Sequence, residues 1–186
     1  MQGASDSPLS VQGRDEARRT AEALSRIKFD TAFSSPMGRA LETARLLVQP
    51  HQDLELTVLA DLHEMDFGFY EKKVYFASPD EVPHGFRRLS LLAKVMVAQV
   101  TGEPLSHVFK RAKKSWECIS AAAPEGTLLV VSHGVLLNYL LKHLLAKPDF
   151  AALRPGGLHP CSITEIMAAC AGDAKLIRLN DTAHLK

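Results

Sequence analysis

Apolar residues recur along this chain with two periods, and the switches between them predict alternating strands and helices. Short apolar or alternating runs predict strands at 29–33, 54–59, 127–132, 160–169 and 174–179. Apolar residues spaced by three and four predict helices at 11–26, 36–49, 89–100, 105–122 and 134–146. Strands separated by helices favour a mostly parallel sheet with helices on both faces. We therefore expect one three-layer α/β domain over residues 1–186.

Two serines mark expected helix starts. Ser10 precedes the first helical segment, where a hydroxyl caps the first turn well. Ser35 followed by Pro36 predicts a second start, with serine as the N-cap and proline as the first helical residue. This start places Arg39 in the opening turns of the helix. A helix N-terminus and a guanidinium group both attract phosphate.

Composition and charge narrow the function classes. The 186 residues are 46% apolar and 23% charged, with a net charge of +1, as in ordinary globular proteins. No basic stripe or aromatic platform indicates a nucleic-acid partner. The cysteines at 118, 161 and 170 lack disulfide or zinc spacing, which favours reduced thiols in the cytoplasm. Polar residues within 128–146, and an N-terminus unlike a signal peptide, argue against a membrane.

Two further segments carry candidate chemistry. Ser132-His133-Gly134 ends a buried strand, where open α/β sheets place reactive groups, although alone it is more often a simple turn. Glu64 lies in a loop with Phe67 and Phe69. An acid in apolar surroundings is suited to donate a proton to a leaving oxygen, although a solvated loop acid is the plainer interpretation.

These motifs, taken in order, resemble the histidine phosphatase superfamily, whose best-known branch is the cofactor-dependent phosphoglycerate mutases. The resemblance covers nearly the whole chain. It rests on Gln2-Gly3 with Asp6-Ser7-Pro8-Leu9, Ser35 with Arg39 and Thr43, Leu62 with Glu64 and Gly68, Gly102-Glu103 with Arg111, Ser132-His133-Gly134, and Leu179-Asn180-Asp181.

The resemblance implies phosphoryl transfer from a small phosphomonoester through a phosphohistidine, with no metal and no other cofactor. Arg39 would bind the phosphoryl oxygens, and His133 would stabilise charge on the transferring group. Glu64 would protonate the leaving alcohol and then activate water. These are the tasks that phosphoryl transfer sets, namely positioning and the countering of negative charge. The phosphate- and substrate-binding set would be completed by Ser35, Gln2, Gly3 and Gly134.

One departure from the family changes the expectation for activity. The family's nucleophile lies in an Arg-His-Gly motif on its first strand, and none of the eight histidines here stands in that motif. We expect roughly fifteen to twenty residues, about one strand and a loop, to lie upstream of Met1, so that the chain as printed is inactive. The two strands expected beside the missing strand are 127–132 and one of the closing strands. Without it they would carry backbone N–H and C=O groups that have no hydrogen-bond partner. This predicts low stability, a homodimer or a segment swapped with a partner, or a local rearrangement.

Several functions stay open at this point. A phosphatase is favoured over a mutase, because residues 73–102 lack the arginine-rich stretch expected of a mutase. The alternative is a non-catalytic phosphate-binding or interaction protein, in which Arg39, Glu64 and His133 hold an anion without turnover. A third hypothesis is that another histidine of this chain serves as the nucleophile. The sequence does not identify the substrate.

Overall fold

The computed structural model describes residues 3–71, 100–145, 157–168 and 173–186. Its helices and strands are α1 (Val11–Leu24), β1 (Thr31–Ser34), α2 (Gly38–Val48), β2 (Leu56–Val58), α5 (Leu105–Ala122), β3 (Leu128–Val131), α6 (Gly134–Leu144), β4 (Ile163–Met167) and β5 (Lys175–Asp181). Short 3₁₀ turns lie at Ala60–Leu62, Gly68–Tyr70 and Ala183–Leu185. The predicted helix at 89–100 lies outside the described residues, apart from Val100. In the described ranges no helix has the length and apolarity needed to cross a membrane.

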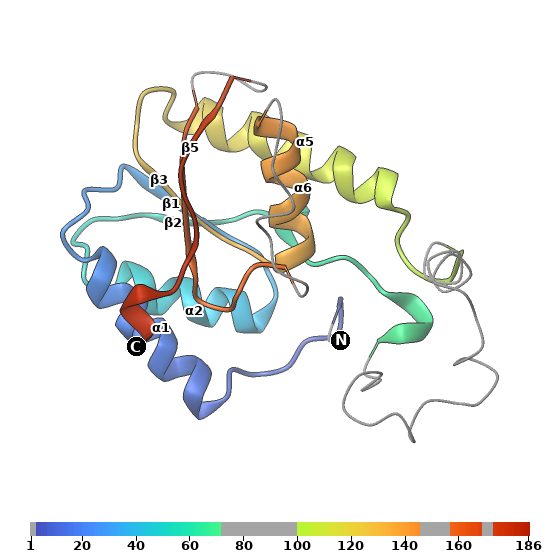
Figure 1. The fold of residues 1–186 in the computed structure, drawn as a ribbon, viewed down its shortest axis with the longest axis horizontal. Helices are drawn as coiled ribbons and strands as arrows, with labels where there is room; N and C mark the ends of the chain where they lie inside the picture. The colour runs from blue at the N-terminus through green and yellow to red at the C-terminus, as the bar shows by residue number, and fades with distance from the viewer. Residues whose placement is uncertain (1–2, 72–99, 146–156, 169–172) are drawn as a thin grey trace.

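The predicted α/β class is confirmed, with a parallel sheet between two helical layers. The strands run in the order β2-β1-β3, and β1 is parallel to both neighbours. In Figure 1, α1 and α2 lie on one side of this sheet and α5 and α6 on the other. Side chains alternate accordingly along β1, since Ala32 joins the core with α1 and α2 while Phe33 joins the core with α5 and α6.

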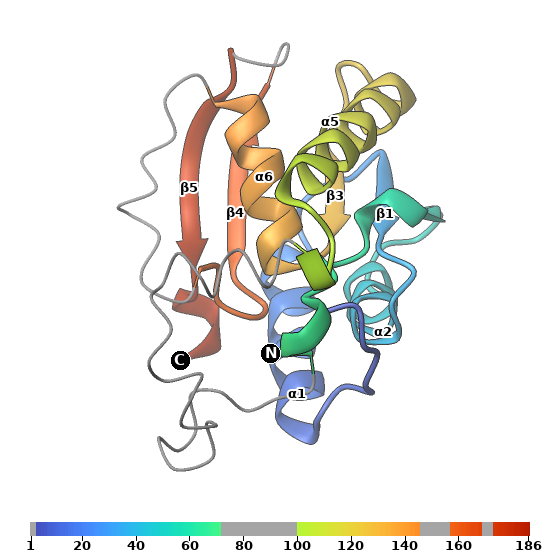
Figure 2. The same ribbon diagram turned by 90° about the vertical axis from the view of Figure 1, so that its right-hand side faces the viewer.

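The closing strands form a sheet of their own. β4 and β5 pair as an antiparallel hairpin, which stands beside α6 in Figure 2. Within the described ranges β3 pairs only with β1, and β4 pairs only with β5. Leu129 and Val131 of β3 nevertheless share a hydrophobic cluster with Ile163 of β4. One edge of each strand thus has no strand partner in the part of the chain that the structure describes.

The start of α2 corrects the sequence prediction. The helix begins at Gly38 rather than at Pro36, and Met37 occupies the N-cap position. The hydroxyl of Ser35 accepts a hydrogen bond from Met37 N (3.2 Å), which forms a turn before the helix instead of capping it. The first helical N–H, that of Gly38, donates to the carboxylate of Asp6 (2.7 Å). At α1, in contrast, Ser10 caps the helix as predicted, since its Oγ accepts from Gly13 N (3.0 Å).

Candidate active site

The candidate site forms where β1 and β3 end. Ser34 of β1 pairs with Val131 of β3, so the residues that follow these parallel strands emerge at the same edge of the sheet. His133 Nε2 lies 2.8 Å from Ser35 Oγ, although the two residues are 98 positions apart in the chain. Both side chains are buried. The sheet register therefore brings the predicted histidine and serine into direct contact.

Met37 connects the remaining candidates to this pair. Its backbone N–H donates to Ser35 Oγ, and its sulfur accepts from Glu64 N (3.4 Å) and from Arg39 Nη2 (3.7 Å). Met37 is itself buried. Met37 therefore contacts the side chain of Arg39 and the backbone of Glu64 directly, and is linked to His133 through Ser35.

The carboxylate of Glu64 sits at the N-terminus of α6, with 8% of the residue exposed. Its Oε1 accepts from the N–H groups of Met65 (2.9 Å) and Leu136 (3.3 Å), and its Oε2 accepts from Val135 N (3.3 Å). Helix N-termini attract negative charge, which favours this placement. A carboxylate oxygen can accept two hydrogen bonds. Oε2 accepts only the bond from Val135 N among the described residues, so it can accept a second hydrogen bond.

Arg39 binds the N-terminal segment of the chain in this structure. Its guanidinium donates to the carbonyl oxygens of Ser5 (2.8 Å, Nη1) and Gly3 (2.8 Å, Nη2). The carboxylate of Asp6 lies 3.9 Å from Nη1 and accepts from the N-terminus of α2 at Gly38. Residues 3–6 therefore lie against Arg39, and the first N–H of α2 is satisfied by the protein itself. A bound anion would have to use other donors of Arg39 or displace these bonds.

The remaining predicted residues differ in what can be said of them. Gln2 lies outside the described residues. Gly3 has a φ of +53°, a conformation that glycine adopts readily, and contributes its carbonyl oxygen to Arg39. Gly134 is the first residue of α6, directly after His133. Among the described residues, no atom apart from its chain neighbours and its own helix backbone lies within 4 Å of the position that a Cβ would take there. In the part of the chain that the structure describes, the first turn of α6 thus has open space at Gly134.

A buried ion pair supports the loop that carries Glu64. Arg111 of α5 makes two bonds to the carboxylate of Glu103, from Nε (2.8 Å) and from Nη2 (2.7 Å), and each side chain is 13% exposed. Its Nη1 donates to the carbonyl oxygens of Asp61 (2.7 Å) and His63 (2.9 Å). The loop on either side of Leu62 is thereby fixed to α5, directly before Glu64.

The surroundings of His133 keep its imidazole neutral. Burial, and then the positive charge of Arg39, lower the pKa of His133 from 6.5 to about 3. His63 and Arg111 act in the same direction, while Asp6 opposes them. A neutral imidazole donates from one ring nitrogen and accepts at the other. His133 is therefore a neutral hydrogen-bonding group of the site at physiological pH.

This lowered pKa predicts an acid-dependent stability. As the pH falls below 6.5, the unfolded chain binds the His133 proton and the folded chain does not, so stability decreases from there towards pH 3. Between pH 6.5 and about 4.5 the loss from this group should be about 2 to 3 kcal/mol. Urea unfolding at several pH values should show a shallower decline for His133→Gln. The exposed His107→Gln serves as a control, and equal declines in all three proteins would contradict the assignment.

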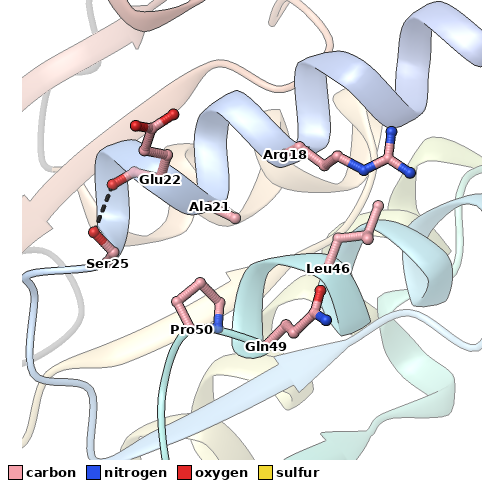
Figure 3. Close-up of a pocket in the computed structure, with 7 residues that line it drawn as sticks. All are labelled: Arg18, Ala21, Glu22, Ser25, Leu46, Gln49 and Pro50. Atoms are coloured by element: carbon pink, nitrogen blue, oxygen red, sulfur yellow. Dashed lines mark hydrogen bonds between the residues drawn. The ribbon is translucent and has the colours of Figure 1, made fainter.

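The site is distinct from the groove shown in Figure 3. That groove measures about 370 Å³ and lies between α1 and α2. Arg18, Glu22 and Ser25 lie along one side of it, and Leu46, Gln49 and Pro50 along the other. None of the predicted site residues lines it, so it does not change the placement of the site.

Three contributors to the site were not predicted from the sequence: Asp6, Met37 and the structural use of Arg111. A signal for Asp6 exists at Gly38, because a Cβ there would lie 2.8 Å from the Asp6 carboxylate. The glycine at position 38, at the start of the helix, thus indicated that another group approaches the backbone closely there. Met37 and Arg111 act through a sulfur and through backbone carbonyl oxygens, which leave no such mark.

Comparison with known proteins identifies similar chains. The model of the histidine phosphatase superfamily (branch 1) matches residues 1–182. A probable phosphoglycerate mutase GpmB of Enterobacter sp. (strain 638) is 31% identical over 168 residues, which cover 89% of this chain and 76% of the relative.

Solved structures give the same result. YhfR of Bacillus stearothermophilus has a TM-score of 0.79 at 27% identity, and the match covers 100% of this chain and 91% of that one. A mycobacterial glucosyl-3-phosphoglycerate phosphatase, solved with VO3, has a TM-score of 0.77 at 25% identity, covering 98% and 91%.

Proposed function

Since the chain belongs to the histidine phosphatase superfamily, we propose that it binds the phosphoryl group of a small phosphomonoester and takes part in its hydrolysis through a phosphohistidine. One observation carries the proposal: Met37 contacts the guanidinium of Arg39 and the backbone N–H of Glu64 and is linked to the neutral imidazole of His133 through Ser35. The carboxylate of Glu64 lies at the N-terminus of α6, the helix that begins directly after His133. The names of the similar proteins include both mutases and phosphatases. The sparse thiols, with Cys118 and Cys161 both free, support placing the activity in the cytoplasm.

Each of the three side chains has a role that fits its contacts. Arg39 would bind phosphoryl oxygens with those N–H groups that Gly3 and Ser5 do not use. His133 would donate a hydrogen bond to the same group. Glu64, whose Oε2 keeps an acceptor position, would deliver a proton to the leaving alcohol and later take one from water. The arrangement supplies charge and orientation, which are the main requirements of phosphoryl transfer.

The nucleophile is the part of the proposal that the described residues do not provide. The printed sequence contains no Arg-His-Gly, so we propose that turnover requires a strand that bears this motif. The edges of β3 and β4 that lack a strand partner among the described residues suggest its place. A strand inserted there would pair with both edges and would extend the cluster that Leu129, Val131 and Ile163 share.

The test compares the printed chain with the same chain extended at its N-terminus by a strand designed to carry Arg-His-Gly. Both are assayed on p-nitrophenyl phosphate and on a panel of sugar phosphates, nucleotides and phosphoglycerate. We expect the extended form to hydrolyse at least one of these compounds, and the printed chain to be slower by about 1,000-fold or more. Light scattering of both forms would show whether the printed chain dimerises or swaps a segment.

Two outcomes would change the proposal. Equal rates in both forms would place the nucleophile within the printed chain, and mass spectrometry of the phosphorylated protein would then locate the phosphohistidine. An absence of both hydrolysis and phosphate binding in the two forms would contradict the proposed function altogether.

A further inference from the structure

The hydrogen bonds of Ser35 restrict where its proton can be. Ser35 is completely buried, and its Oγ has two neighbours within hydrogen-bonding distance, Met37 N and His133 Nε2. The backbone N–H of Met37 can only donate, so it occupies one acceptor position of the hydroxyl. A buried hydroxyl proton needs an acceptor of its own. Among the described residues, the one acceptor within its reach is Nε2 of His133.

This restriction determines the tautomer of the imidazole. If Ser35 donates to Nε2, that nitrogen carries no proton, and in a neutral ring the proton is then on Nδ1. His133 forms no side-chain bond other than that to Ser35 among the described residues. Three side-chain atoms of the described residues are completely buried without a hydrogen-bond partner, namely His51 Nε2, Ser115 Oγ and Asn138 Oδ1, and His133 Nδ1 is not one of them. This nitrogen is therefore not completely buried, and its proton has no acceptor among the described residues, so it can donate to a ligand.

We propose that Ser35 is a positioning residue that holds His133 in the Nδ1–H tautomer, so that Nδ1–H is the group that donates to a bound phosphoryl oxygen. This changes the role of Ser35, which the sequence placed among the phosphate-binding residues. The side chain of Ser35 has no exposed surface, and its hydroxyl is already bonded to Met37 N and His133 Nε2. Ser35 can therefore act on a ligand only through the imidazole of His133. The second half of this inference, the phosphoryl partner, rests on the proposed function, whereas the tautomer does not.

The charges around the ring fit this assignment. Arg39, His63 and Arg111 act on the imidazole as positive groups, with Asp6 opposed to them, and His133 also stands at the N-cap of α6. Positive surroundings disfavour a second proton on the ring. One tautomer of a neutral imidazole, and not the doubly protonated ion, therefore persists well below neutral pH.

Two-bond ¹H–¹⁵N NMR correlations of the imidazole nitrogens test the tautomer directly in the full chain, without any ligand. The His133 signals are assigned by their loss in His133→Gln. We expect the wild-type protein to show an unprotonated Nε2 and a protonated Nδ1 from pH 8 down to about pH 4. A wild-type ring protonated at Nε2 at neutral pH would overturn the proposal.

Two serine variants separate positioning from general structural damage. Ser35→Ala removes the donor to Nε2, and we expect the single tautomer to give way to a mixture or to the Nε2–H form. Ser34→Ala is the matched control, because Ser34 is equally buried but its hydroxyl donates to Ser35 O (2.9 Å). The control should keep the wild-type pattern. An unchanged tautomer in Ser35→Ala would overturn the proposal, as would an equal change in Ser34→Ala.

Titration with inorganic phosphate tests the second half. We expect the Nδ1 signals of the wild-type protein to shift on binding, and Ser35→Ala to bind phosphate roughly 3- to 10-fold more weakly. Binding that leaves Nδ1 unperturbed would overturn the role of this donor while the tautomer result stands. An absence of any phosphate binding, with the predicted tautomer observed, would count against the proposed function and not against the positioning by Ser35.

Discussion

Arg111→Met is expected to destabilise the protein by about 3 to 5 kcal/mol, the largest effect of a single substitution that the structure predicts. The guanidinium of Arg111 makes two bonds to the largely buried carboxylate of Glu103 and two to the carbonyl oxygens of Asp61 and His63. Methionine fills a similar volume but leaves all four acceptors without this donor. A buried charge that loses its partner is more harmful than a pair removed together. Urea unfolding monitored by circular dichroism measures the change.

Two further variants show whether the ion pair is the cause. The double variant Arg111→Met/Glu103→Leu should recover more than half of the lost stability, because it removes the unpaired carboxylate. Lys113→Met on the same helix serves as the control. Its ion pair with Glu117 is long (3.9 Å) and exposed, so its effect should stay within about 0.5 kcal/mol. A loss below about 1 kcal/mol for Arg111→Met would show that the pair does not hold the loop.

Arg39→Ala is expected to weaken the binding of inorganic phosphate by about 10- to 100-fold. Loss of one or two charge-assisted hydrogen bonds to an anion corresponds to about 1.5 to 3 kcal/mol. Isothermal titration calorimetry on the printed chain measures this effect without any need for turnover. Arg39→Lys should give an intermediate affinity, since lysine keeps the charge but not the planar fork of donors.

The same experiment separates two uses of Arg39. The structure shows this guanidinium bound to the carbonyl oxygens of Gly3 and Ser5, a contact that holds the N-terminal segment without any anion. Arg45→Ala, an exposed arginine on the same helix, is the matched control and should leave phosphate affinity unchanged. If Arg39→Ala and Arg45→Ala bind phosphate equally well, then Arg39 organises the N-terminal segment only.

Most of what the sequence predicted correctly follows from periodicity. The apolar run before His133 and the helical pattern after it predict a strand that ends just before this residue, and β3 ends at Val131. Parallel strands place their carboxyl ends together, so the pairing of Ser34 with Val131 brings Ser35 to His133. Local pattern and the rules of sheet pairing were sufficient for the fold class and for the contact between Ser35 and His133.

The details that the sequence did not predict depend on contacts between distant segments. The N–H of Gly38 at the start of α2 donates to the carboxylate of Asp6, 32 positions upstream. The Ser-Pro pair that predicted the helix start does not indicate that a distant carboxylate accepts from the first helical N–H. The bonds from Arg111 to Asp61 and His63 span 50 and 48 positions. Every residue offers a carbonyl oxygen, so no sequence pattern marks the ones that an arginine will bind.

One measurement tests most directly whether Arg39, Glu64 and His133 form a single anion site. Inorganic phosphate is titrated into the ¹⁵N-labelled chain, and the backbone amide signals are followed by NMR. We predict that the signals of Arg39, Glu64, His133 and Gly134 shift together with one dissociation constant, while those of Ala21 and Gln49 in the groove between α1 and α2 do not move. Shifts that follow different dissociation constants at these residues, or that are confined to the groove, would contradict the shared site.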